Sequence, residues 1–238
     1  MTATLHKANT RGHASHGWLD SYHTFSFANY YNPERVHFGA LRVLNDDMVA
    51  ADMGFGKHPH DNMEIISIPL SGDLAHEDSM GHKQVIRQGD VQVMSAGTGV
   101  FHSEYNPNID KAAKFLQIWL FPNQKNVTPR YGQQTFDVKD RHNRWQNIIN
   151  PDPNSGVLWL HQDAWFDMGD FEAGQESTYT LRNPANGLYI FVLEGNLEAN
   201  GQALECRDGL GITGSTEVRF TFTSDAQVLL MEVPMELS

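Results

Sequence analysis

The sequence predicts an all-β protein built from two antiparallel β-barrels packed together. Short apolar or alternating runs recur between turns rich in Gly, Pro, Asn and Asp, and long amphipathic helical patterns are hard to find. Short strands at turn-punctuated spacing are typical of sandwiches and barrels. In addition, residues 68–74 resemble residues 191–197, and each copy is followed by a polar turn and a second Gly/Asp pair. Two copies of one barrel explain this repeat.

The strands expected in the first half of the chain are the alternating or apolar runs that stop at turn-forming residues. They cover residues 39–44, 64–70, 91–94 and 115–120. The composition then changes, because residues 123–156 are rich in Asn, Gln, Asp, Pro and Arg and show little periodicity of apolar residues. We interpret that stretch as a connecting segment.

Strands are expected to resume at residues 157–160, 188–193, 218–222 and 228–233. The predicted organisation is therefore an N-terminal barrel over residues 1–130, a connecting segment over 131–156 and a C-terminal barrel over 157–238. A chain of 238 residues is long enough for two domains, each with its own core.

Two short residue pairs are the main candidates for functional residues. His58-Pro59-His60 and His102-Ser103-Glu104 both have the spacing i, i+2, which places the two side chains of each pair on the same face of an extended strand. Two such strands lying side by side would bring three imidazoles and one carboxylate to one point. Because imidazoles and carboxylates suit divalent transition metals, the sequence predicts a metal site inside the first barrel.

The residues around both pairs resemble the two halves of the cupin signature. Gly54 and Glu64 frame the first pair, while Gly89, Gly97 and Asn106 frame the second. The fit is imperfect, because Gly72 closes the first half one residue late and Gly97 stands where a proline is expected. On the cupin pattern alone, Glu64 competes with Glu104 for the place of the carboxylate ligand. An isolated His-x-His pair is more often a surface feature, so the agreement of several elements decides the interpretation.

Five longer motifs stand out, namely Arg11–Tyr31, Arg42–Asp47, Gly56–His60, Ala75–Gly81 and Met94–Glu104. Together they resemble the pirin family, most closely its bacterial quercetin 2,3-dioxygenase-like members. The likeness is dense over about the first 130 residues and looser afterwards. The resemblance implies a bicupin fold, each barrel being a double-stranded β-helix, and one metal in the N-terminal barrel. It implies His58, His60, His102 and Glu104 as the metal ligands, with Glu64 beside them.

The resemblance also implies an activity. A flavonol such as quercetin would bind at the metal through its 3-hydroxyl, Glu104 would take the proton as catalytic base, and reaction with O2 would open the ring and release carbon monoxide. Iron(II) is the metal expected on family grounds, while the ligand set also accepts Zn, Cu, Mn, Ni or Co.

Two other functions remain open at this point. Pirin-family proteins also act as regulators, so the chain could be a non-catalytic, redox-sensitive metalloprotein that binds protein partners. A cupin enzyme with another small substrate, such as a different phenol or a thiol, is the third possibility.

Composition narrows the class of protein. Residues 131–238 carry 6 Lys and Arg against 16 Asp and Glu, which disfavours direct binding to nucleic acid or to an anionic membrane. The single cysteine, Cys206, cannot form an intramolecular disulfide, and no stretch approaches the length of a membrane span. We expect a soluble cytoplasmic protein.

The remaining candidates are assigned to packing. His13, His16 and His23 are expected to be packing or hydrogen-bonding histidines, and His76 and His82 to flank a turn and face solvent. The aromatic residues between 25 and 31 are expected in the core, with the barrel mouth as the alternative. Aligning the repeat places the missing ligands of the second barrel near residues 181, 183, 221 and 223, none of which is a metal ligand. The second barrel is therefore expected to be free of metal.

Overall fold

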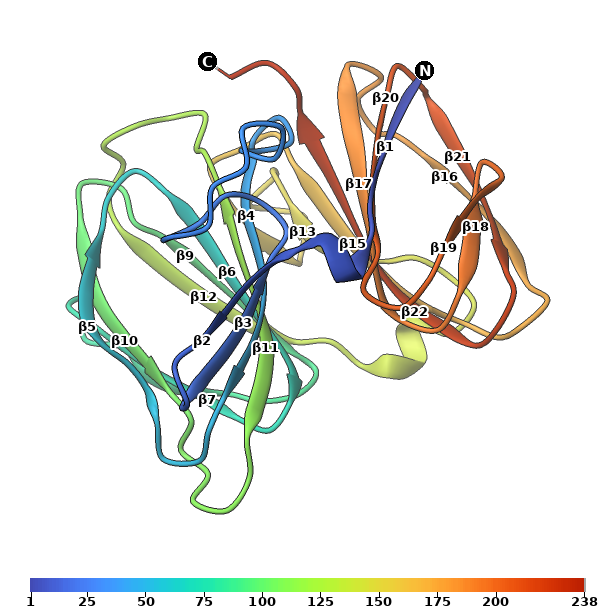
Figure 1. The fold of residues 1–238 in the computed structure, drawn as a ribbon. Coiled ribbons are helices and arrows are strands. Elements are labelled where there is room, and N and C mark those ends of the chain that lie inside the picture. The colour runs from blue at the N-terminus through green and yellow to red at the C-terminus, as the bar shows by residue number, and fades with distance from the viewer. Residues whose placement is uncertain (238) are drawn as a thin grey trace.

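The computed structural model describes residues 1–237, which form an almost entirely β protein with four sheets and two short 3-10 helices, η1 (Ala8–Thr10) and η2 (Val138–Arg141). Figure 1 shows two β lobes, the first coloured blue to green and the second orange to red. No helix within residues 1–237 is long and apolar enough to cross a membrane.

The first domain pairs a seven-stranded sheet with a four-stranded sheet. In sheet order the large sheet consists of β12 (Arg130–Thr135), β9 (Asp90–Ser95), β6 (Glu64–Ser71), β11 (Ala113–Leu120), β4 (Leu41–Val49), β3 (Leu19–His23) and β2 (Gly12–Ser15). The small sheet consists of β5 (Gly54–His60), β10 (Val100–Tyr105), β7 (Leu74–Asp78) and β8 (Lys83–Ile86).

The second domain repeats this plan, which agrees with the internal repeat in the sequence. Its seven-stranded sheet consists of β1 (Thr2–His6), β20 (Gly209–Thr213), β17 (Asn186–Glu194), β22 (Ala226–Pro234), β15 (Trp165–Phe171), β13 (Gln146–Asn150) and β14 (Leu158–Trp159). Its four-stranded sheet consists of β16 (Glu176–Thr180), β21 (Glu217–Phe222), β18 (Leu197–Ala199) and β19 (Gln202–Leu204).

The expected all-β, two-cupin architecture is confirmed, with one refinement. In each domain the large and small sheets face each other as a sandwich, and no hydrogen-bonded ladder within residues 1–237 closes them into a single barrel. Every strand expected from the sequence is present, with ends that differ by a few residues because local patterns define strand ends poorly.

Two segments join the domains in ways that a linear division of the chain does not describe. Strand β1 pairs with β20, so the first strand of the chain lies in the sheet of the second domain, as Figure 1 shows for the blue N-terminal strand. The predicted connecting segment contains β13, which pairs with β15 in the second domain. Strand β12, which precedes β13 in the chain, pairs with β9 in the first domain. The domain boundaries themselves stay a prediction.

The largest hydrophobic core lies between the domains. It combines buried side chains from both seven-stranded sheets, such as Ile66 and Ile118 from the first and Phe191 and Leu229 from the second. Burying apolar area at this interface stabilises both sheets at once, since an apolar face of each sheet is covered that would otherwise be exposed to water.

The interiors of the two domains differ. The second is filled by one apolar cluster that includes Val218, Phe220 and Phe222 of β21. The first contains two smaller apolar clusters, one around Phe115 and one around Ile65, that leave room for polar side chains between them. Position 221 of the repeat alignment is exposed, so the inward-facing positions of β21 are one residue away from those that the alignment gave.

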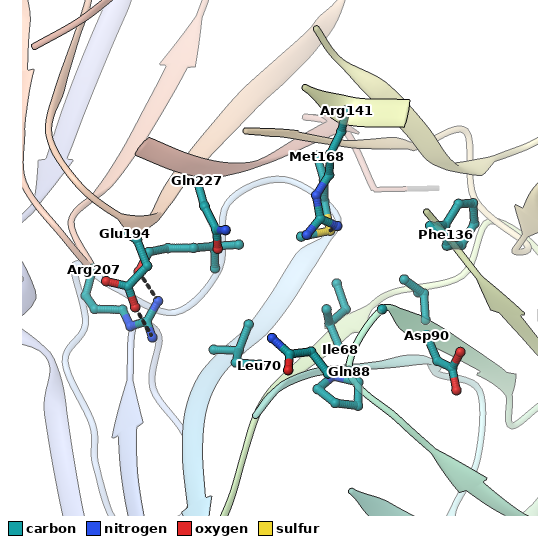
Figure 2. A pocket seen from close by; sticks show the side chains of 14 residues that line it. Ile68, Leu70, Gln88, Asp90, Phe136, Arg141, Met168, Glu194, Arg207 and Gln227 are labelled. Atoms are coloured by element: carbon teal, nitrogen blue, oxygen red, sulfur yellow. Dashed lines mark hydrogen bonds and ion pairs between the residues drawn. The ribbon is translucent and has the colours of Figure 1, made fainter. Parts of the chain in front are cut away.

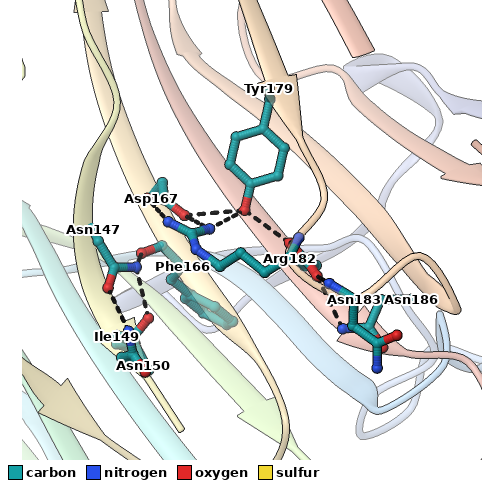
Figure 3. A network of polar contacts seen from close by, with 10 residues as sticks. Asn147, Ile149, Asn150, Phe166, Asp167, Tyr179, Arg182, Asn183 and Asn186 are labelled. Carbon is teal, nitrogen blue, oxygen red and sulfur yellow. Dashed lines mark hydrogen bonds and ion pairs between the residues drawn. The ribbon is translucent and has the colours of Figure 1, made fainter. Parts of the chain in front are cut away.

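A buried polar network closes one end of the second domain (Figure 3). The guanidinium of Arg182 donates to both oxygens of Asp167, at 2.7 and 2.8 Å. The hydroxyl of Tyr179 lies 3.1 Å from an oxygen of Asp167 and 3.1 Å from an oxygen of Glu232, and donates its single proton to one of them. Glu232 is fully buried and also accepts the backbone N–H of Asn183 at 2.9 Å. Each carboxylate therefore has several donors, which offset the cost of burying its charge.

Candidate metal centre

The two predicted residue pairs lie on neighbouring strands. Strand β10 pairs with β5, and His102 stands directly opposite His58, with Val100 opposite His60. Because side chains alternate along each strand, the pairs from both strands point to the inner face of the small sheet. The imidazole centroids are 4.4 Å apart for His58 and His102, 4.8 Å for His60 and His102, and 4.9 Å for His58 and His60.

The nitrogens of this cluster are arranged to bind something. Nδ1 of His58 contacts the backbone oxygen of Gly56 at 2.7 Å, which leaves Nε2 free. Nε2 of His60 and both ring nitrogens of His102 are buried without a hydrogen-bond partner among residues 1–237. Buried polar atoms are rarely left unpaired, so three such nitrogens in one cluster suit the binding of a cation.

Burial also sets the protonation of the cluster. Desolvation, reinforced by the neighbouring histidines, lowers the pKa of His60 to about 4 and that of His102 to about 3. Both rings are therefore neutral near pH 7, the form in which an imidazole offers a lone pair to a metal. The donor set and its protonation fit a divalent transition metal.

Glu104 is the carboxylate on this side of the sheet. It is 1% exposed, accepts a hydrogen bond from the Ser67 hydroxyl at 2.9 Å, and accepts another from the Gln117 amide at 2.6 Å. Ligand atoms of Glu104, His102 and His76 lie within 4.8 Å of one another, and so do those of the three predicted histidines. His102 belongs to both groups, while Glu104 is grouped with His76 rather than with His58 and His60, so the set of four ligands stays a prediction.

Glu64 points the other way. It begins β6, where Ser67 faces the small sheet, whereas Ile66 and Ile68 face the core between the domains. Glu64 shares the parity of the latter two and accepts a hydrogen bond from Ser95 at 2.7 Å. Burial raises the pKa of Glu64 to about 7. The structure thus separates the two carboxylates that the cupin pattern left in competition.

A cavity of about 490 Å³ opens beside the cluster. His58, His60 and Glu104 are among the residues that line it. Its walls include the aromatic side chains of Trp18, Phe27, Phe55 and Trp119. This volume and this lining are typical of a site for a small, mainly apolar molecule.

One wall of the cavity is polar. Strands β3 and β4 supply Ser21, His23, Asn45 and Asp47, and the Ser21 hydroxyl donates to the Asp47 carboxylate. Burial raises the pKa of Asp47 to about 7, and the nearby charges of Asp46 and Glu104 act in the same direction. A ligand in this cavity therefore meets aromatic faces on most sides and hydrogen-bonding groups on one.

Of the histidines assigned to packing, none of His13, His16 and His23 belongs to a potential metal-binding group in the described part of the chain. His16 and His23 line the cavity instead, and His13 pairs with Asp20 at 2.6 Å. Among the aromatic residues, Phe25 is in the core, 1% exposed, and Phe27 lines the cavity mouth.

The expectation for the turn histidines is wrong in one case. His76 is 1% exposed and lies beside the cluster, because its position on β7 is directly opposite Glu104 on β10 and faces inward. His82 lies on the rim, with 37% of its side chain exposed, and also contacts Asp78. The nearby hairpin turn suggested that His76 faces solvent, but the alternation of side chains along β7 places it in the interior of the first domain.

The sequence analysis also missed Ser67, Gln117 and Asp47. Ser67 and Gln117 are polar residues on inward-facing positions of mainly apolar strands, which is their only signal, whereas Asp47 lies in the polar run of residues 45–47 within β4. A second cavity, of about 70 Å³, lies between the domains near Arg141 and Arg207 (Figure 2). It contains none of the cluster residues, and Arg207 is paired there with Glu194 at 3.6 Å.

Two sandwiches of this topology, with a histidine cluster on β5 and β10 of the first, define the class: a two-domain cupin protein whose first domain is suited to a divalent metal.

Comparison with known proteins narrows the class to a family. Residues 4–120 match the family described as Pirin, and residues 147–233 match the quercetinase C-terminal cupin domain. The chain is 44% identical over 230 residues to a quercetin 2,3-dioxygenase of Escherichia coli K12, covering 97% of this chain and 98% of that protein. The chain belongs to the pirin family.

Further relatives agree with this assignment. A putative quercetin 2,3-dioxygenase of Pseudomonas aeruginosa is 43% identical, with 93% of this chain and 95% of that protein covered. The crystal structure of YhhW from Escherichia coli superimposes with a TM-score of 0.94 at 42% identity over 100% of both chains. The structure of the bacterial pirin YhhW in complex with nickel(II) gives a TM-score of 0.93 at 42% identity, over 98% of this chain and 99% of that one.

Proposed function

We propose that this protein is a metal-dependent dioxygenase that cleaves flavonols such as quercetin with O2 and releases carbon monoxide. The observation that carries the proposal is that histidines of the cluster and Glu104 line a cavity with aromatic walls. The names of the relatives support the substrate class.

The proposed metal ligands are His58, His60, His102 and Glu104, with iron(II) as the metal. Imidazole and carboxylate ligands accept iron, and cellular supply decides between it and the other divalent metals. When bound, the metal supplies positive charge that stabilises a deprotonated substrate oxygen and a centre at which O2 chemistry becomes accessible. A cytoplasmic location is part of the same proposal and rests on the sequence.

The chain's own residues supply binding and proton transfer. Trp18, Phe55 and Trp119 offer aromatic faces to a planar ligand. Glu104 lines the cavity and takes the proton of the 3-hydroxyl, while hydrogen bonds from Ser67 and Gln117 hold its carboxylate in place. The buried setting of Glu104 excludes water that would compete for the same proton.

The test measures O2 uptake, carbon monoxide release and loss of the visible absorption of quercetin with iron-loaded protein. Free iron at the same concentration is the control, because flavonols oxidise slowly by themselves. We expect Glu104→Gln to lose about 10²- to 10⁴-fold in rate, since an amide cannot accept the proton. If the wild-type protein releases no more carbon monoxide than free iron does, the proposal fails. Binding of a protein partner is then the leading function.

A further inference from the structure

We propose that His76, held by Asp78, is a positioning residue of the metal centre that accepts the N–H of His102 and so fixes its orientation. This inference rests on the proposed metal site. It concerns a residue outside the four proposed ligands, in a segment that the sequence had placed at the solvent.

The carboxylate of Asp78 is held in place by several hydrogen bonds. It is 8% exposed, and its Oδ1 accepts the backbone N–H groups of Met80 at 2.9 Å and His82 at 3.1 Å. Nδ1 of His82 contacts both carboxylate oxygens, at 3.0 and 3.1 Å, and Nε2 of His76 contacts Oδ2 at 3.0 Å. These four donors use the whole acceptor capacity of a carboxylate.

The contact with Asp78 determines which nitrogen of His76 carries the proton. The backbone N–H groups of Met80 and His82 can only donate, and both of them bond to Oδ1 of Asp78, as expected for an ionised carboxylate. An ionised carboxylate only accepts hydrogen bonds, so Nε2 of His76 is the donor. In the neutral ring Nδ1 then has a bare lone pair, and this atom is buried with no partner among residues 1–237.

His102, in contrast, needs an acceptor for a ring N–H. When one ring nitrogen of a histidine binds a metal, the other carries a proton and almost always donates it to an acceptor that sets the ring's orientation. For His58, the backbone oxygen of Gly56 is in place to be that acceptor. Neither nitrogen of His102 has a partner in the described residues.

The structure leaves His76 as the acceptor for His102. The rings of His76 and His102 lie 5.4 Å apart between centroids. Asp78, directly opposite His102 on β7, has its oxygens filled, and the Glu104 oxygens accept from Ser67 and Gln117 and are proposed to bind the metal itself. The ligand atoms of His76 and His102 lie within 4.8 Å, a gap that one bridging water or a rotation of the His102 ring closes.

Tyr131 of β12 packs against both histidines that contact Asp78. Its ring packs on His76 at 4.9 Å and on His82 at 4.8 Å between centroids. The Tyr131 hydroxyl donates to Gln133 at 2.8 Å, which fixes the phenol ring. The chain of contacts therefore runs from the rim of the small sheet, through Asp78 and His76, to His102.

The first experiment measures Ni²⁺ and Co²⁺ dissociation constants, by competition with a chelator, for the full-length wild type and for His76→Leu. We expect His76→Leu to bind about 10- to 100-fold more weakly and to change the visible spectrum of bound Co²⁺. His76→Gln should recover part of the affinity, because its amide can donate to Asp78 and accept from His102. His6→Leu is the matched control, since His6 is a buried histidine of the second domain that bonds Tyr189 at 2.8 Å.

Asp78→Asn is the second variant, in case removing the imidazole disturbs folding. The Asn oxygen would remain on the backbone N–H groups of Met80 and His82, so its NH₂ would face His76 and move the ring proton to Nδ1. We expect ¹⁵N NMR of the imidazoles to report this change of tautomer in the metal-free protein, together with weaker Ni²⁺ binding.

The outcomes separate the inference from the proposed site. A wild type that binds no Ni²⁺ contradicts the proposed metal site. A wild type that binds Ni²⁺, with His76→Leu equal to it in affinity and Co²⁺ spectrum, overturns the role of His76. X-ray absorption that counts four imidazoles in the wild type and three in His76→Leu makes His76 a ligand, and also overturns the positioning role.

Discussion

Individual residues in this protein are assigned by strand parity more than by residue type. Glu64 and Glu104 are both buried glutamates, but Glu64 faces the core between the domains and Glu104 faces the histidine cluster. His76, which the turn beside it suggested was at the surface, faces inward for the same reason. A shift of one position along a strand would exchange these roles.

The first prediction concerns the proposed ligands. His58→Ala, His60→Ala and His102→Ala should each lose most of the bound metal, because each removes one of four bonds, while the sandwich stays folded. Elemental analysis of the purified variants measures this, with circular dichroism as the check on folding. Glu64→Gln is the matched control and should retain metal, since its side chain lies on the opposite face of β6. Full metal occupancy in all three alanine variants would refute the ligand assignment.

The second prediction concerns the pH dependence of stability. Burial raises the pKa of Glu64 to about 7 from its ordinary value of 4.5, so between these values the folded state holds a proton that the unfolded state has already lost. The stabilisation is complete below about pH 4.5 and is lost as the pH rises toward 7. Glu64→Gln should reduce the slope of the unfolding free energy in this window by up to about 1.4 kcal/mol per pH unit. Urea denaturation at several pH values measures it, and equal slopes would contradict the prediction.

The strands β5 and β10 hold the cluster through the loops at their ends. Asn106, immediately after β10, is 0% exposed, and its amide NH2 donates one proton to the backbone oxygen of Lys111 at 2.8 Å and shares the other between those of Val49 and Ala50, each at 3.2 Å. This single side chain thus ties the end of β10 to the end of β4 and to the loop before β11. The sequence singled out Asn106 as part of the cupin pattern, and the structure gives it this structural role.

The third prediction follows from those three bonds. Asn106→Ala should lower the free energy of unfolding by roughly 2–4 kcal/mol, because it leaves buried carbonyl oxygens without donors. The measurement is chemical denaturation of the metal-free protein. Asn154→Ala, in an exposed turn, is the control and should change stability by less than about 0.5 kcal/mol. An Asn106→Ala protein as stable as the control would show that the three bonds contribute little.

The whole molecule depends on the core between the domains. Both seven-stranded sheets contribute buried side chains to it, and β1 begins the chain in the sheet of the second domain. The two domains are therefore expected to unfold together rather than independently, although only the first contains the histidine cluster.

The fourth prediction tests that coupling. Phe191→Ala removes a fully buried ring from the core between the domains and should cost about 3–5 kcal/mol. Hydrogen exchange should then become faster in both β17 and β11, which lie in different domains. Phe222→Ala, inside the second domain, is the control and should act mainly on that domain. Unchanged exchange in β11 of the Phe191→Ala protein would show that the domains are independent.

The sequence by itself determined the all-β class, the strands and the two pairs on β5 and β10. These depend on alternation over a few residues, which is a local property of the chain. It also carried the resemblance to the pirin family, through motifs of consecutive residues.

Tertiary structure alone decided which face each side chain occupies. The register between β7 and β10 placed His76 opposite Glu104, and the parity of β6 turned Glu64 away from the cluster. Likewise, the pairing of β1 with β20 assigned the start of the chain to the second domain. These outcomes depend on contacts between residues far apart in sequence, whose free energies no local pattern encodes.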